Sequence, residues 1–210
     1  NWLNINSGES GMNKLLQILG RGISISISDL IWEWLAVTIH RNPQMENSPE
    51  GARIANITEL IYSGKTEAAE EQLRLHLFEN TGCIYGRMAA AGLDLEKNQI
   101  KNAIENLNSV YMRQPTNTMA LYALGCCYER LGQEAEAIEF YQDCLKFKDY
   151  LDLPRQRLAA IYFKRGQLEQ VTEQYEYLSK EHPEDVFALN ILGYLYIYDK
   201  KYSRAIDTFN

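Results

Sequence analysis

Three histidines and four cysteines are the side chains best suited to catalytic or metal chemistry in this 210-residue chain. The histidines His40, His76 and His182 lie far apart, and none has a metal-ligand spacing such as HExxH or a nucleophile paired with it. We expect His76 to pack within a helix and His182 to sit in a turn before Pro183. The sequence therefore predicts no catalytic residue, no metal, no cofactor and no enzymatic activity.

The cysteines also lack the spacing of a metal site. They are Cys83, Cys126, Cys127 and Cys144. On a helix, the adjacent Cys126 and Cys127 would point about 100° apart, which is poor geometry for one shared ion. Free cysteine usually behaves as a small buried hydrophobe in a reducing compartment. We therefore interpret all four as buried thiols and predict a cytoplasmic location.

The charge and composition of the chain indicate which classes of protein it can belong to. The formal net charge is −7, and no basic stripe of the kind that nucleic acid requires is present. The hydrophobic content of 46% and only five prolines argue against disorder. We therefore expect an ordered protein that does not bind nucleic acid.

The elements that would position any site repeat every 34 residues. Residues 118–149 read as two amphipathic helices joined by a glycine turn. Within them the small residue Gly125 is matched one period apart by Ala91, Ala159 and, two periods on, Gly193. A helix pair of this length cannot bury its apolar face alone, so it must stack on a neighbouring copy. The period predicts an array of helix pairs.

This pattern resembles the tetratricopeptide repeat family, in which the 34-residue unit carries small residues at positions 8, 20 and 27 and bulky ones at 4, 7, 11 and 24. The resemblance covers residues 49–210, with repeats at 50–83, 84–117, 118–151 and 152–185 and a partial repeat at 186–210. The first repeat departs most, with Asn56 at a bulky position and Ile57 and His76 at small ones. The resemblance implies an all-α fold, a right-handed α-solenoid of tandem helix-turn-helix repeats.

The turns inside the repeats carry glycine at position 15. They are Gly64, Gly132 and Gly166, where a residue that tolerates positive φ ends the first helix. Asn98 and Lys200 take this place in the other two turns. Asparagine is a fair substitute and lysine is not, so we expect the last turn to differ.

Residues 1–48 form an additional N-terminal helical segment. Residues 1–11 read as a remnant before a native start at Met12, followed by helices near 13–19 and 29–40 and a polar linker at 41–48. The second of these helices, with Ser28 or Asp29 as its N-cap, is apolar around most of its circumference and too short to span a membrane. It must therefore be buried, either capping the first repeat or lying in a groove of its own or another molecule.

The resemblance also implies a binding surface. In this family positions 2, 5, 9, 12 and 13 of each first helix line a concave groove, and we call them the inner-face positions. The candidate groove residues are Tyr85, Met88, Met119, Tyr122, Cys126, Arg130, Gln156, Phe163, Phe187, Asn190, Tyr194 and Tyr198. This apolar and aromatic set favours a peptide or an amphipathic helix as ligand. The alternative is that many of these side chains pack against neighbouring helices.

The groove does not match the relatives that hold the carboxylate tails of chaperones. Of the five basic or amide positions of such a clamp, only Arg157 agrees. The other four hold Met88, Gly92, Ala123 and Leu153. A carboxylate-terminal peptide is therefore not the expected ligand.

The sequence thus predicts an interaction scaffold for a protein or peptide partner. The alternative is the N-terminal regulatory region of a larger enzyme or signalling protein, because Asn210 falls within a predicted helix with no capping helix behind it. Self-association is a further candidate, through the 29–40 helix or the uncapped C-terminal face. A membrane adaptor using residues 15–39 is disfavoured, since that stretch lacks a Lys/Arg-rich polar face.

Overall fold

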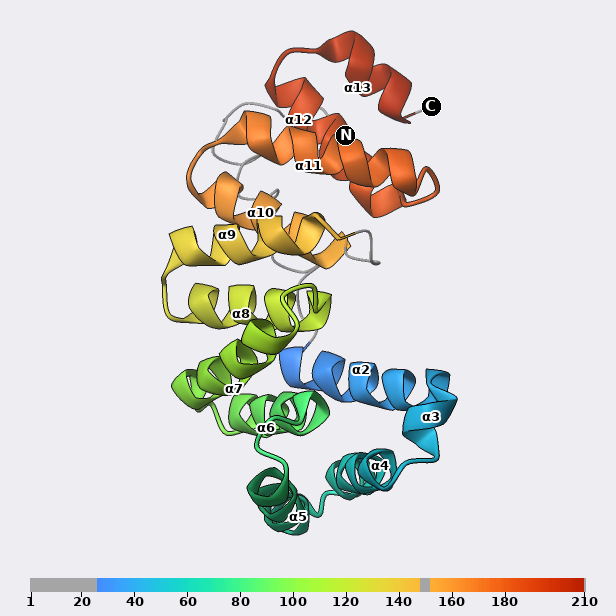
Figure 1. Cartoon of the computed structure of the whole chain (residues 1–210). Helices are drawn as coiled ribbons and strands as arrows, with labels where there is room; N and C mark the ends of the chain where they lie inside the picture. Colours follow the sequence, from blue (N-terminus) through green and yellow to red (C-terminus); the bar gives the residue numbers. More distant parts are fainter. Residues whose placement is uncertain (1–25, 148–151, 210) are drawn as a thin grey trace. The chain divides into compact units, whose positions relative to one another are not determined.

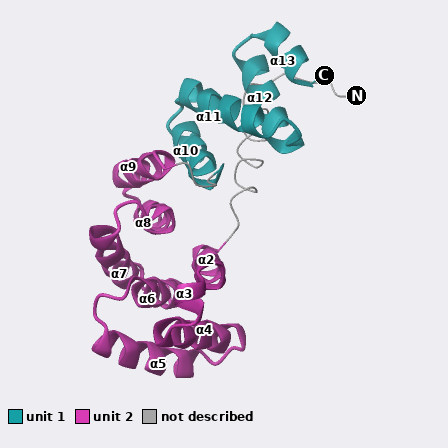
Figure 2. Cartoon of the chain, turned by 45° about the vertical axis from the view of Figure 1, so that its right-hand side comes forward, with its two compact units in different colours: residues 1–24, 148–210 teal, residues 25–147 magenta. Residues whose placement is uncertain are grey.

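The computed structural model describes residues 26–147 and 152–209, and over these ranges it contains twelve helices, α2–α13, and no strand (Figure 1). The helix predicted near 13–19 and the remnant predicted at 1–11 lie outside the described residues. The chain divides into two compact units. The larger unit contains α2–α9 and the smaller unit contains α10–α13 (Figure 2).

The helices follow the 34-residue period. The first helices of the repeats are α4 (Pro49–Tyr62), α6 (Ile84–Glu96), α8 (Thr118–Arg130), α10 (Asp152–Lys164) and α12 (Val186–Tyr198). The second helices are α5 (Thr66–Glu79), α7 (Ile100–Arg113), α9 (Glu134–Leu145), α11 (Leu168–Glu181) and α13 (Tyr202–Phe209). Each first helix packs on its own second helix, and within the units α5, α7 and α11 also pack on the next first helix. The predicted all-α fold of stacked helix-turn-helix repeats is confirmed.

Small residues allow the two helices of a repeat to approach closely. Gly125 of α8 lies directly against the buried ring of Tyr141 on α9, and a Cβ atom at this position would overlap that ring. In the smaller unit Gly193 of α12 faces the ring of Phe209 on α13 in the same way. Close packing leaves no room for a larger residue at either position. The periodic small residues are therefore the contact points of the helix pairs.

The turns between paired helices share one backbone conformation. Among the described residues, positive φ occurs at Gly64, Asn98, Gly132, Gly166 and Lys200. Lys200 has φ 59°, and the N–H of the next residue, Lys201, donates to the carbonyl of Tyr196 at 2.8 Å. The glycine turn after α8 has the same bond, from Gln133 to Tyr128 at 2.9 Å. The prediction that the last turn would differ is wrong, because helix packing holds a lysine in the glycine conformation.

Two helices precede the repeats, α2 (Ile27–Arg41) and α3 (Pro43–Glu46). The N-cap of α2 is Ser26 and not Ser28 or Asp29, so the helix begins earlier than predicted. The segment predicted as a polar linker contains α3, whose N-cap Asn42 accepts hydrogen bonds from the backbone N–H of the second and third residues of the helix. Met45 of α3 is buried. The connection from α2 to the repeats is therefore ordered.

The strained turn gives a stability prediction. Replacing Lys200 by glycine should raise the free energy of unfolding by about 0.5–1 kcal/mol, because a left-handed φ costs a non-glycine residue more than glycine loses in chain entropy. Urea denaturation of the full chain followed by circular dichroism measures the change. Lys201→Gly is the matched control, since Lys201 lies outside the left-handed region, and it should give no gain. An equal gain in both variants would contradict the strain argument.

Candidate functional site

Helix α2 lies against the first helices of the repeats. It packs mainly on α6 and also contacts α4 and α8, all within the larger unit (Figure 1). Its buried apolar residues are Ile27, Ile31, Trp32, Leu35 and Ile39. The acidic residues Asp29 and Glu33 are exposed on its other side. The apolar helix predicted at 29–40 is therefore buried, and it packs against the repeats of its own chain.

Trp32 is the main anchor of α2. Its side chain is only 1% exposed, and its indole ring packs over Gly92 of α6, where a Cβ atom would come within 3.0 Å of the ring. Its Nε1–H donates to a carboxylate oxygen of Glu96 at 2.7 Å. A hydrogen bond to a charged acceptor is stronger than one between neutral groups. The absence of a side chain at Gly92, an inner-face position, thus creates the space that receives the indole.

A second aromatic contact connects α2 to α6. Trp34 stacks on Tyr85, with ring centroids 6.1 Å apart and an interplanar angle of 26°. Burial raises the pKa of the Tyr85 hydroxyl. Tyr85 is a candidate groove residue, and in this structure its ring contacts a helix of the same chain.

Most other candidate groove residues of the larger unit are buried. They are Met88, Met119, Tyr122 and Cys126. The ring of Tyr122 lies 5.8 Å from that of Tyr141 on α9, and the Tyr141 hydroxyl donates to the sulfur of Cys126 at 3.2 Å. These two side chains therefore contribute to packing inside their own repeat. Arg130, at the end of α8, is exposed.

The candidate groove residues of the smaller unit divide between core and surface. Phe163 is buried in the core of that unit, and Phe187 packs against this core while partly exposed. Gln156 is half-buried. Asn190, Tyr194 and Tyr198 of α12 are exposed, although the Tyr194 ring makes an edge contact with Phe209 at 6.1 Å between centroids. The exposed candidates of this unit are therefore concentrated on α12.

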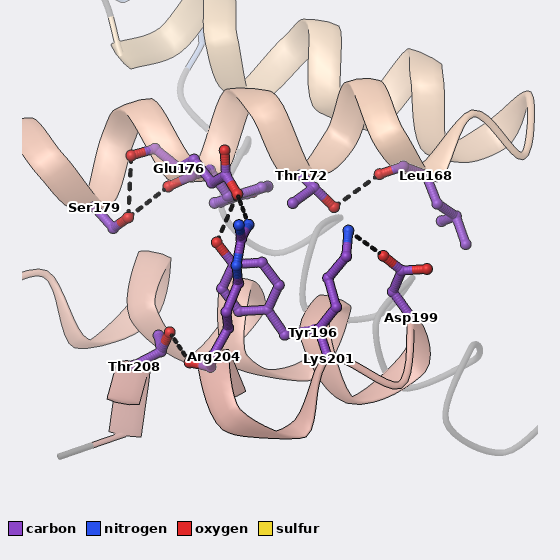
Figure 3. A network of polar contacts seen from close by, with 10 residues as sticks. Leu168, Thr172, Glu176, Ser179, Tyr196, Asp199, Lys201, Arg204 and Thr208 are labelled. Carbon is purple, nitrogen blue, oxygen red and sulfur yellow. Dashed lines mark hydrogen bonds and ion pairs between the residues drawn. The ribbon is translucent and has the colours of Figure 1, made fainter. Parts of the chain in front are cut away.

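A polar pocket of about 500 Å³ lies between α11 and the C-terminal end of α12 with the turn that follows it. Figure 3 shows the polar contacts of this region. At one side Glu176 accepts a hydrogen bond from the Tyr196 hydroxyl at 2.6 Å and pairs with Arg204 at 3.5 Å. Asp199 pairs with Lys201 in the adjacent turn. Burial and the bond to Glu176 raise the pKa of Tyr196. Exposed ion pairs of this kind contribute little stability. Of the two, the pair between Glu176 and Arg204 joins α11 to the last helix pair.

The cysteine thiols have the environment expected from the sequence. All four are free and buried. Burial raises the pKa of Cys83 to about 12, with a further contribution from a hydrogen bond to Glu50, and burial raises the pKa of Cys127 to about 12. Thiols with such pKa values remain protonated and unreactive at neutral pH.

The structure also brings together residues that the sequence reasoning had treated separately. The ligand atoms of Glu50, His76 and Cys83 all lie within 4.8 Å of one another. Their spacing in the chain matches no known metal motif. The one available signal was the period: Glu50 opens the first repeat and Cys83 closes it, and stacking brings repeat ends together.

Comparisons with known proteins agree with this architecture. The sequence model of a family described as "Psidin, N-terminal TPR repeats region" matches residues 93–208, which is more than half of the chain. Among curated proteins no significant match exists. No helix within 26–147 or 152–209 has the length and apolar content needed to cross a bilayer.

Solved structures with the same fold are distant in sequence. MamA protein has a TM-score of 0.63 and 17% identity, over 75% of this chain and 86% of that chain. YrrB, described as a TPR protein with an unusual peptide-binding site, has a TM-score of 0.59 and 18% identity, over 83% and 88%. A tetratricopeptide repeat protein from Parabacteroides merdae has a TM-score of 0.59 and 20% identity, over 95% and 77%. At these identities the likeness concerns the fold.

The anchoring of α2 can be tested by stability. Trp32→Ala should lower the free energy of unfolding by about 3–5 kcal/mol, because it removes a buried aromatic ring and leaves a cavity. Val37→Ala, on the exposed side of α2, should change it by less than about 0.5 kcal/mol. Urea denaturation of both variants gives the comparison. Equal, small losses would show that α2 is not held on α6.

Proposed function

The chain belongs to the tetratricopeptide repeat family, and from this we propose that it is an interaction scaffold that binds an apolar helical segment of a protein partner. The proposal includes no catalytic activity. The repeats provide a series of first helices whose inner-face positions are rich in aromatic and aliphatic side chains. Such a surface suits the apolar face of a helix or peptide, since rigid aromatic residues bind at low entropic cost.

The single observation that carries this proposal is the position of α2. Here an apolar helix already lies on α4, α6 and α8, with Trp32 over Gly92 and Trp34 on Tyr85. In this contact an apolar helix packs on the first helices of the repeats within one chain. A partner helix of similar composition would find comparable contacts wherever first helices are left uncovered.

The uncovered first-helix residues that we propose for partner binding lie on α12. Tyr194 and Tyr198 are 44% and 51% exposed, and Asn190 is exposed beside them. Tyrosines are frequent energetic hot spots of interfaces because they combine a large apolar ring with a polar tip. The description of YrrB as having a peptide-binding site supports a peptide or helix as the class of ligand.

Two further features of the proposal concern association and location. For two copies to associate through residues 29–40, α2 would have to detach from α6. Its buried side chains would then lose their contacts, so an exchange of α2 between two copies would be unfavourable. The exposed apolar residues Tyr202, Ile206 and Phe209 of α13 are the other candidate surface for a second copy.

Four buried free thiols fit a reducing compartment, which supports a cytoplasmic location.

Partner binding is tested by one substitution on α12. Tyr194→Glu places a charge on the proposed surface and should weaken binding of a partner isolated with the wild-type chain by about 30-fold, the effect of losing a hot spot worth about 2 kcal/mol. The measurement is a dissociation constant from fluorescence anisotropy with the purified partner.

The matched control is Tyr177→Glu. Tyr177 of α11 is 43% exposed, almost the same as Tyr194, but lies on a second helix. Circular dichroism should show the same helix content in both variants. Binding that is equally weakened by the two substitutions, or by neither, would place the partner elsewhere on the chain.

A further inference from the structure

Three helix ends meet at one end of the first repeat. Glu50 is in the first turn of α4, His76 is in the last turn of α5, and Cys83 is the N-cap of α6. Because α4 and α5 form a helical hairpin and α6 follows directly, the start of α4, the end of α5 and the start of α6 come together. One oxygen, one nitrogen and one sulfur atom of these residues lie within 4.8 Å of one another.

Two members of the cluster are hydrogen-bonded to each other. The Cys83 thiol donates a hydrogen bond to a carboxylate oxygen of Glu50, with a sulfur–oxygen distance of 2.7 Å. The thiol directs its S–H bond at a lone pair of the carboxylate, so loss of the thiol proton would leave two lone pairs directed at one point. A cation that displaced this proton would find two anionic ligands already adjacent.

His76 is the unsatisfied member. Its side chain is only 2% exposed, and neither ring nitrogen has a hydrogen-bond partner among the described residues. A buried polar group without a partner is destabilising, and such groups in native proteins call for an explanation. A metal ion bound through one of these nitrogens would provide the missing partner.

We propose that Glu50, His76 and Cys83 form a binding site for a divalent late transition-metal ion, with Zn²⁺ as the expected ion. Carboxylate, imidazole and thiolate are all ligands of Zn²⁺, whereas Ca²⁺ and Mg²⁺ require oxygen ligands alone. On binding, the Cys83 thiol loses its proton to solvent and forms a sulfur–metal bond. The carboxylate and the thiolate then balance the two positive charges of the ion.

The geometry requires only a small adjustment. Ligands about 2.0–2.3 Å from a tetrahedral Zn²⁺ are about 3.3–3.8 Å apart. The widest separation in the cluster, at most 4.8 Å, exceeds this by about one ångström. The Cys83 sulfur and the Glu50 oxygen are 2.7 Å apart and must separate by about 0.6–1.1 Å when an ion replaces the proton between them. The half-buried Glu50 side chain can move by this amount through a change of rotamer.

The surroundings of the cluster suit a metal-bound thiolate. The backbone N–H of Gly86 donates to the Cys83 sulfur at 3.1 Å. Cys83 also stands at the N-terminus of α6, where the helix dipole favours negative charge. The nearby guanidinium of Arg53 is paired with Glu79, which offsets its charge. The Gly86 N–H and the helix N-terminus place partial positive charge beside the sulfur, which partly offsets the burial that keeps the thiol protonated when no ion is bound.

An ion can reach the cluster from solvent. Glu50 and Cys83 line a surface pocket of about 360 Å³ together with Asn80, Gly82, Ile84 and Tyr85. With three protein ligands, a tetrahedral ion would have one further position for a water molecule. The ion would bridge α4, α5 and α6 and so stabilise the first repeat.

The test uses the untagged, reduced 210-residue chain and Co²⁺ as a spectroscopic substitute for Zn²⁺. Co²⁺ should produce the visible absorption of a four-coordinate ion and a near-ultraviolet thiolate charge-transfer band, both lost when Zn²⁺ is added. Zn²⁺ should raise the midpoint of thermal unfolding, because a ligand of the folded state stabilises it. No cobalt spectrum from the wild-type chain would overturn the proposal.

Variants assign the ligands. Cys83→Ala should abolish the charge-transfer band and weaken Zn²⁺ binding at least about 100-fold, and the nearly isosteric Glu50→Gln should weaken it by at least about tenfold. Cys127→Ala removes another buried thiol and His182→Ala another histidine, and both should leave the spectrum unchanged. If Cys83→Ala bound Co²⁺ with the wild-type spectrum, the site would be elsewhere. Partner binding at Tyr194 is measured separately, so the two proposals fail independently.

Discussion

The contact on which the repeats depend is that between a small residue on one helix and a large ring on its partner. Gly125 meets the ring of Tyr141, and Gly193 meets that of Phe209. Because the helices of a pair approach so closely, each pair presents a continuous apolar ridge to the next, and stacking completes a core that no single repeat has. The same device recurs between α2 and α6, where Gly92 receives the indole of Trp32. Glycine therefore allows close helix packing both within the repeats and between α6 and α2.

The position of α2 determines which surface is available for a partner. It covers inner-face residues of the larger unit, as the stacking of Trp34 on Tyr85 illustrates. A partner that used these residues would first have to displace a helix whose buried side chains include Trp32 and Leu35, and intramolecular contacts hold an advantage over intermolecular ones because no association entropy is lost. The exposed tyrosines of α12 carry no such cost. Among the described residues, α2 thus covers part of the first surface, and the tyrosines of α12 remain exposed.

Much of the fold could be predicted from the sequence because periodicity is a local signal. The 34-residue period locates each helix pair, and Gly125 marks where a pair makes contact. The period cannot predict which inner-face residues stay exposed, since that depends on side chains from distant segments. Cys126 is buried beside Tyr141, whereas Tyr194, at the same position two repeats later, is 44% exposed. Lys200 shows the remaining limit: its strained φ is imposed by the helices it connects and not by its own preference.

The cluster of Glu50, His76 and Cys83 could not be predicted, because its members lie 26 and 7 residues apart and only the helix ends bring them together. It occupies the repeat that matches the family pattern least, where His76 fills a position normally held by a small residue. Tyr85 lines the same pocket as Cys83 and also stacks on Trp34 of α2. The proposed ion would therefore lie at a pocket that also contains a residue in contact with α2. Because coupling between two sites is reciprocal, any strengthening of this contact by the ion would be matched by weaker ion binding in a variant that loosens α2.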